Sequence, residues 1–124
     1  MNSKARRFSI PLPNGLLYLR DSESLDDPVV DGKGSFWRTD GVIAIACQGD
    51  VDGPTTILIN GDAGSYAGLS LLTAFDLSVP SKRLSFETVP DDVFHEMTLD
   101  ATVAHVEVWT EGHPNTATVL LKID

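Results

Sequence analysis

Two residues near the C-terminus have the types and spacing that metal binding requires. His105 and Glu107 lie two positions apart in an alternating stretch, so they share one strand face and could hold a zinc ion. A third ligand would have to come from His95, Asp100 or His113, and none of these lies in a zinc motif. We prefer the simpler interpretation, a half-exposed sheet face with mixed polar residues, and keep the pair as a weak metal candidate.

The segment 50–53 (DVDG) resembles part of a calcium loop, because alternate carboxylates present oxygens to a hard cation. Counted from Asp50, the fifth position is Pro54 and the twelfth is Gly61, so the third side-chain ligand and the closing glutamate are missing. Asp-Gly is also a common turn between strands, and we interpret the segment as such a turn.

No set of residues indicates catalysis. Cys47 lies in the most apolar stretch, where a thiol behaves as a small hydrophobic group with a raised pKa. Adjacent acids at 26–27 and 91–92 fall in loops, where solvated charge is the usual explanation. The serines beside glycine lack the spacing of a nucleophile elbow, and the glycines form no phosphate-binding motif. We therefore expect no enzyme activity and no cofactor.

The charge of the chain is unevenly divided. Residues 1–20 carry four bases and no acid, whereas residues 21–124 carry all 18 acids against five bases, a net charge of −13. Such an acidic body repels nucleic acid and anionic lipid, so the expected partner is a basic protein. The sequence leaves self-association open. No apolar run approaches the roughly 18 residues that span a bilayer, and the single Cys47 indicates a reduced, cytoplasmic protein.

The elements that must position these residues are strands, because apolar residues recur with a period of two and no long helical stripe is found. A chain of 124 residues fits one domain. Residues 23–35 are expected to form a long loop, and the short link 79–81 would permit a hairpin. Residues 93–99 are either a short helix capped by Asp91 or Asp92, or an edge strand. Strands are expected at 15–22, 41–48, 55–62, 71–79, 82–89, 103–111 and 116–124, with an earlier one possible at 8–12.

The stretch 41–48 (GVIAIACQ) is apolar on both faces, with Ala44 and Ala46 on its small side. It is therefore expected to be a central strand, buried on both sides, whose small side lies close to a neighbouring layer. Seven or eight strands at this spacing predict a single all-β domain, an antiparallel β-sandwich.

Two stretches, FWRTDGVIAIACQ (36–48) and SKRLSFETVP (81–90), resemble the competence protein J family. These are small acidic bacterial proteins that inhibit a nuclease acting on entering DNA. AFDLSV (74–79) and VEVWTEG (106–112) resemble two further strands of the family, in the right order. The resemblance covers half of the chain and implies a β-sandwich-like domain without catalytic residues, which acts by covering the active site of a nuclease.

Such an inhibitor would suit the charge pattern, because nucleases bind polyphosphate through basic clefts that carboxylates can occupy. The expected contact group has acids from the 23–31 loop and the 49–53 turn, together with two aromatic residues of a type that often anchors interfaces. Burial inside the domain is the preferred interpretation of Trp109. The group comprises Asp26, Asp27, Asp31, Asp50, Asp52, Trp37 and Trp109. The sequence leaves open whether the two acidic regions lie at the same end of the domain.

Overall fold

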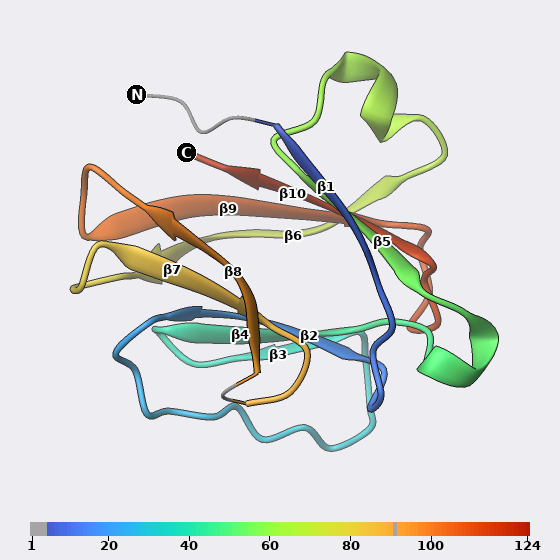
Figure 1. Cartoon of the computed structure of the whole chain (residues 1–124), viewed down its shortest axis with the longest axis horizontal. Coiled ribbons are helices and arrows are strands. Elements are labelled where there is room, and N and C mark those ends of the chain that lie inside the picture. Colours follow the sequence, from blue (N-terminus) through green and yellow to red (C-terminus); the bar gives the residue numbers. More distant parts are fainter. Residues whose placement is uncertain (1–4, 91) are drawn as a thin grey trace.

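The computed structural model describes residues 5–90 and 92–124, which form two five-stranded sheets (Figure 1). The first sheet has the order β1 (Arg6–Ile10), β5 (Thr55–Ile59), β10 (Thr118–Ile123), β9 (Val103–Thr110) and β6 (Ser70–Ser78). The second has the order β3 (Phe36–Arg38), β4 (Val42–Ala46), β2 (Leu16–Asp21), β7 (Arg83–Glu87) and β8 (Val93–Thr98). Two short 3-10 helices, η1 (Asp50–Asp52) and η2 (Ala63–Tyr66), interrupt the connections.

Neighbouring strands are antiparallel throughout, except that β10 runs parallel to β5. The described part of the chain contains no α-helix, and in that part no helix is long and apolar enough to cross a membrane. The all-β prediction is therefore confirmed, whereas the predicted seven or eight strands become ten. Strand β3 was missed because three residues are too few to display an alternating pattern.

One face of each sheet contributes to a shared hydrophobic core. Alternation along β2 and β4 places Leu17, Leu19, Ile43 and Ile45 in this core. The first sheet supplies matching apolar residues from all of its central strands, including Ile57, Val106, Val108, Val119 and Leu121. Figure 1 shows the two sheets as separate layers, with β6, β9 and β10 above β2, β3 and β4. Each sheet therefore has one inner face and one outer face.

Strand β4 is buried on both faces, as predicted. Ile43 and Ile45 belong to the shared core, while Val42 and Ala44 form a second apolar cluster with Tyr18 on the outer face. β4 is an interior strand of its sheet, flanked by β3 and β2, while β2 occupies the middle position. The outer cluster is covered by partly buried side chains, among them Trp37, rather than by another layer of strands.

The predicted hairpin at residues 79–81 is wrong. The link joins β6 in the first sheet to β7 in the second, so it carries the chain from one layer to the other. A tight turn, in which the Lys82 amide donates to the Val79 carbonyl (2.9 Å) and Lys82 adopts a positive φ of 59°, redirects the chain. Residues 93–98 form the edge strand that the sequence left as one of two alternatives, with a bulge opposite Phe86 and Glu87.

Candidate partner-binding face

A buried arginine organises the outer face of the second sheet. Arg20 lies on β2, on the same side as Tyr18, and only 6% of it is exposed. Its Nε donates to Glu87 Oε1 on β7 (3.0 Å) and its Nη2 to Asp27 Oδ1 (2.8 Å). Burial alone would lower the pKa of Arg20, but the hydrogen bonds and charges of Asp27 and Glu87 outweigh it and raise that pKa. The guanidinium is therefore a permanent buried charge that holds both carboxylates.

The same guanidinium fastens the backbone of the acidic loop. Its Nη1 donates to the Asp26 carbonyl (2.8 Å), so the side chain of Arg20 binds the loop through main chain and side chain at once. This fork of donors is what distinguishes arginine from lysine as an anchor. Nearby, Arg83 and Glu23 form a salt bridge at the start of the loop (3.0 Å).

A second contact fastens the later part of the loop. Trp37 Nε1 donates to Asp31 Oδ1 (2.8 Å), and the same oxygen accepts from the Lys33 amide (2.9 Å). The Lys33 amide and the Trp37 indole hold the pKa of Asp31 below its usual value. Asp31 is exposed and therefore remains ionised at neutral pH.

The loop crosses the sheet from one end of β4 to the other. At its start the Asp21 amide donates to the Gly41 carbonyl (3.0 Å), and at its end the Ala46 amide donates to the Ser35 carbonyl (2.9 Å). Figure 1 shows this segment, coloured blue to cyan, running beneath β2, β3 and β4. The predicted long loop is thus a covering strap, hereafter the acidic strap (residues 22–35), fixed to the outer face of the second sheet.

The second acidic region, η1, lies at the Ala46 end. The Asp50 amide donates to the Leu12 carbonyl (3.1 Å), and the Gly53 amide to the Asp50 carbonyl (3.0 Å). The segment is thus a hydrogen-bonded turn, as interpreted from the sequence. Asp26 is bound by Arg20, which pairs with Val42 at the other end of β4, so the structure does not bring all the acids of the expected contact group to one end.

The two tryptophans lie on opposite outer faces. Trp37 packs against the outer cluster of the second sheet, whereas Trp109 lies on the first sheet. Trp109 Nε1 donates to Glu107 Oε1 (3.0 Å), and the Trp109 ring makes an edge-to-face contact with Tyr66 (centroids 4.8 Å apart). Trp109 is therefore only partly covered, by η2, and lies on an outer face instead of being buried inside the domain as the sequence favoured.

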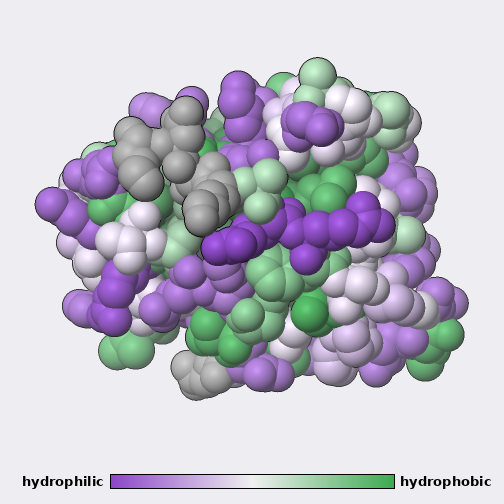
Figure 2. Space-filling model, turned by 45° about the horizontal axis from the view of Figure 1, so that its top comes forward, coloured by the Kyte–Doolittle hydropathy of each residue, from purple (hydrophilic) through white to green (hydrophobic). Residues whose placement is uncertain are grey.

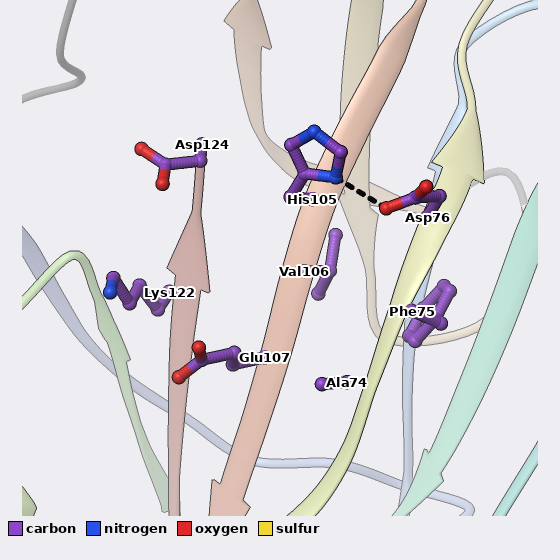
Figure 3. Close-up of a pocket in the computed structure, with 8 residues that line it drawn as sticks. All are labelled: Ala74, Phe75, Asp76, His105, Val106, Glu107, Lys122 and Asp124. Atoms are coloured by element: carbon purple, nitrogen blue, oxygen red, sulfur yellow. Dashed lines mark hydrogen bonds and ion pairs between the residues drawn. The ribbon is translucent and has the colours of Figure 1, made fainter.

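A hollow of about 310 Å³ lies on the first sheet, between residues of β6, β9 and the end of β10. His105 and Glu107 share this surface, and His105 Nδ1 is in close contact with Asp76 Oδ1 rather than with any of the third ligands considered above (Figure 3). His95 instead packs against the rings of Phe8 and Phe86. Within the described residues no group of three or more His, Cys, Asp and Glu side chains is placed to hold a metal ion. The hollow is lined by Ala74, Phe75, Asp76, His105, Val106, Glu107, Lys122 and Asp124.

Cys47 is buried, and burial raises the pKa of its thiol to about 12. At neutral pH it is therefore protonated and inert, in agreement with its interpretation as a small hydrophobic group.

Sequence reasoning missed Arg20 and Glu87 as structural partners. Arg20 was counted with the basic N-terminal segment, although in the structure it forms salt bridges with Asp27 and Glu87. The signal was present: Leu17 and Leu19 take the inner positions of β2, so Arg20 occupies an outer position beside Tyr18. What the pattern did not reveal is that the acidic strap covers that outer position.

No family model matches the chain, and no curated protein matches it. Among solved structures, the chain is similar to ComJ from Bacillus subtilis, the inhibitor of the DNA degrading activity of NucA. This chain folds like ComJ. The match has a TM-score of 0.53 and 14% sequence identity, and covers 98% of this chain and 94% of that one. At this identity the likeness establishes a shared fold, which agrees with the resemblance found in residues 36–48 and 81–90.

Proposed function

We propose that the protein is a nuclease inhibitor that works by binding its target directly. The observation that carries the proposal is the likeness to ComJ along nearly the whole chain, since ComJ inhibits the DNA-degrading activity of NucA. The net charge of −9 supports it. A nuclease holds polyphosphate in a basic cleft, and an acidic protein that occupies this cleft gains both faster association and selectivity.

The acidic strap is the proposed centre of the contact surface. It carries Asp26, Asp27 and Asp31 on a rigid support, so little conformational entropy is lost when a partner orders them. We include Asp50 and Asp52 as a secondary contact at the far end of β4, and Trp37 as support beneath the strap. Trp109 is left out, because it lies on the opposite outer face.

The shared core between two layers supports a β-sandwich, as in the implied family fold. The single buried cysteine and the inhibitory role support action in the bacterial cytoplasm, bound to a basic nuclease.

The test is a titration of DNA degradation by NucA, and by the basic nucleases whose genes neighbour the gene for this chain. Inhibition is expected with one-to-one stoichiometry, and it should weaken as salt is raised, because salt screens the attraction. Asp26→Asn should slow association at low salt more than it speeds dissociation. The matched control is Asp124→Asn, an exposed acid on the first sheet, which should leave both rates unchanged. Absence of both inhibition and complex formation at low salt would reject the proposal.

The hollow on the first sheet supports a second candidate, a small-molecule or metal-binding domain. The specific observation is the close pair His105–Asp76 at the rim of a 310 Å³ recess. Elemental analysis of the purified protein, and melting with and without chelator, test this candidate. A stoichiometric metal or a large fall in Tm on chelation would favour it.

A further inference from the structure

The most exposed large apolar side chains in the described residues are those flanked by acids. Leu25 is 95% exposed and directly precedes Asp26 and Asp27, and Val29 is 84% exposed two residues beyond them. Val51, 91% exposed, lies between the two acids of η1. The exposed apolar residues of the strands, such as Leu71, keep about half of their surface covered (49% exposed). Apolar exposure is thus concentrated in the acidic segments, although contact of apolar side chains with water is unfavourable.

This exposure is not the result of a loose loop. Between Leu25 and Asp31 the chain is held by Arg20, which binds the Asp26 carbonyl and the Asp27 carboxylate, and by the Trp37 indole on Asp31. Pro28 further restricts the backbone. These hydrogen bonds from Arg20 and Trp37 hold the strap in a conformation in which Leu25 and Val29 point to solvent and not toward the outer cluster. Such pre-organised apolar groups are the usual form of an interface anchor.

Figure 2 shows another side of the molecule, turned so that the top of Figure 1 comes forward, where hydrophobic and hydrophilic residues are interspersed. The flanking charges decide what kind of molecule can cover Leu25 and Val29. A second copy of this chain brings another net charge of −9, and an anionic lipid surface is likewise repelled. A basic protein surface with an apolar recess satisfies both features of the strap.

We propose that Leu25 and Val29 are the apolar anchors of the inhibitor interface, inserting into an apolar recess at the rim of the basic cleft of the target nuclease. This inference rests on the proposed function and deepens it. The carboxylates on either side form the polar rim that steers the approach, while the two anchors set the lifetime of the complex. Affinity and rate of association are therefore controlled by different residues of the same strap.

The experiment measures association and dissociation rates of Leu25→Ser and Val29→Ser with the nuclease that the wild-type protein inhibits. Each substitution is expected to raise Kd at least about tenfold, chiefly through faster dissociation, while the salt dependence of the association rate stays unchanged. Leu71→Ser, the same exchange on the first sheet, is the matched control and should stay within about twofold of wild type. Urea midpoints equal to wild type would show that both strap variants fold.

The outcomes separate the two proposals. If the wild type inhibits a nuclease and both strap variants keep its affinity within about twofold, the proposed role of Leu25 and Val29 is rejected and the inhibitor function stands. A loss caused equally by Leu71→Ser would also reject the anchors, because it would make the effect non-local. If the wild-type protein binds none of the nucleases tested, the function is rejected and the anchors with it.

Discussion

Replacing Arg20 by methionine should cost a large part of the stability of the domain. The change removes the guanidinium that compensates the charge of Glu87, whose side chain is only 4% exposed. It also frees the Asp26 carbonyl and the Asp27 carboxylate of the strap. Removing one partner of a buried ion pair costs about 3–5 kcal/mol. A single domain has a total stability of about 5–15 kcal/mol, so Arg20→Met should shift the urea midpoint strongly.

The double variant Arg20→Met, Glu87→Leu supplies the control. It removes both charges together, and apolar pairs in place of buried ion pairs are often neutral or stabilising. The double variant should therefore be more stable than Arg20→Met alone, a non-additivity that a double-mutant cycle measures directly. Urea unfolding followed by tryptophan fluorescence gives the free energies, and limited proteolysis reports whether the strap has loosened. A loss below about 1 kcal/mol for Arg20→Met, or a double variant whose cost is the sum of the single ones, would refute the reasoning.

Three further predictions concern the core and its titrating groups. Ile45→Ala should cost about 2–5 kcal/mol and Ala44→Leu about 1–3 kcal/mol in urea unfolding, because one opens a cavity and the other overpacks the outer cluster; near-neutral results would contradict burial of β4 on both faces. Cys47 should react with a thiol reagent only after unfolding, and rapid labelling of the native protein would contradict its burial. Burial and the charge of Arg6 lower the pKa of His95 below 6.5 in the folded state, so the unfolded chain binds the proton more readily. The contribution of His95 to the free energy of unfolding should be fully present above about pH 6.5 and decline as the pH falls below this value. In His95→Gln the fall of the urea midpoint with pH should be smaller.

The alternating pattern predicted the strands well, because side chains of a strand point to opposite faces with a period of two. Leu84 and Phe86 point inward and Glu107 outward, as the pattern requires. The same pattern does not specify which strands pair. The hairpin predicted at residues 79–81 failed for this reason, since period two is equally satisfied when consecutive strands belong to different sheets.

The acidic residues of the candidate surface could be predicted from the sequence, but the contacts that hold them in place could not. The acids of the strap are evident from the sequence, yet their support is Arg20, whose buried partner Glu87 lies 67 residues away. No local signal links two residues so far apart. For the same reason the exposure of Leu25 and Val29 was missed, because an apolar residue in a loop can equally be a core contact. The direction of these side chains is set by the hydrogen bonds of Arg20 and Trp37 to the strap, which only the structure shows.

The position of β10 between β5 and β9 has a consequence for the synthesis of the protein. Until this strand leaves the ribosome, the first sheet consists of two separate pairs, β1 with β5 and β6 with β9. Each pair presents an open strand edge and an uncovered apolar face, the features that promote aggregation of nascent chains. The parallel pairing of β10 with β5 joins segments about 60 residues apart, which also favours slow folding. The first sheet therefore closes only when β10 has emerged and inserted between β5 and β9, and until then its open edges are exposed to other chains.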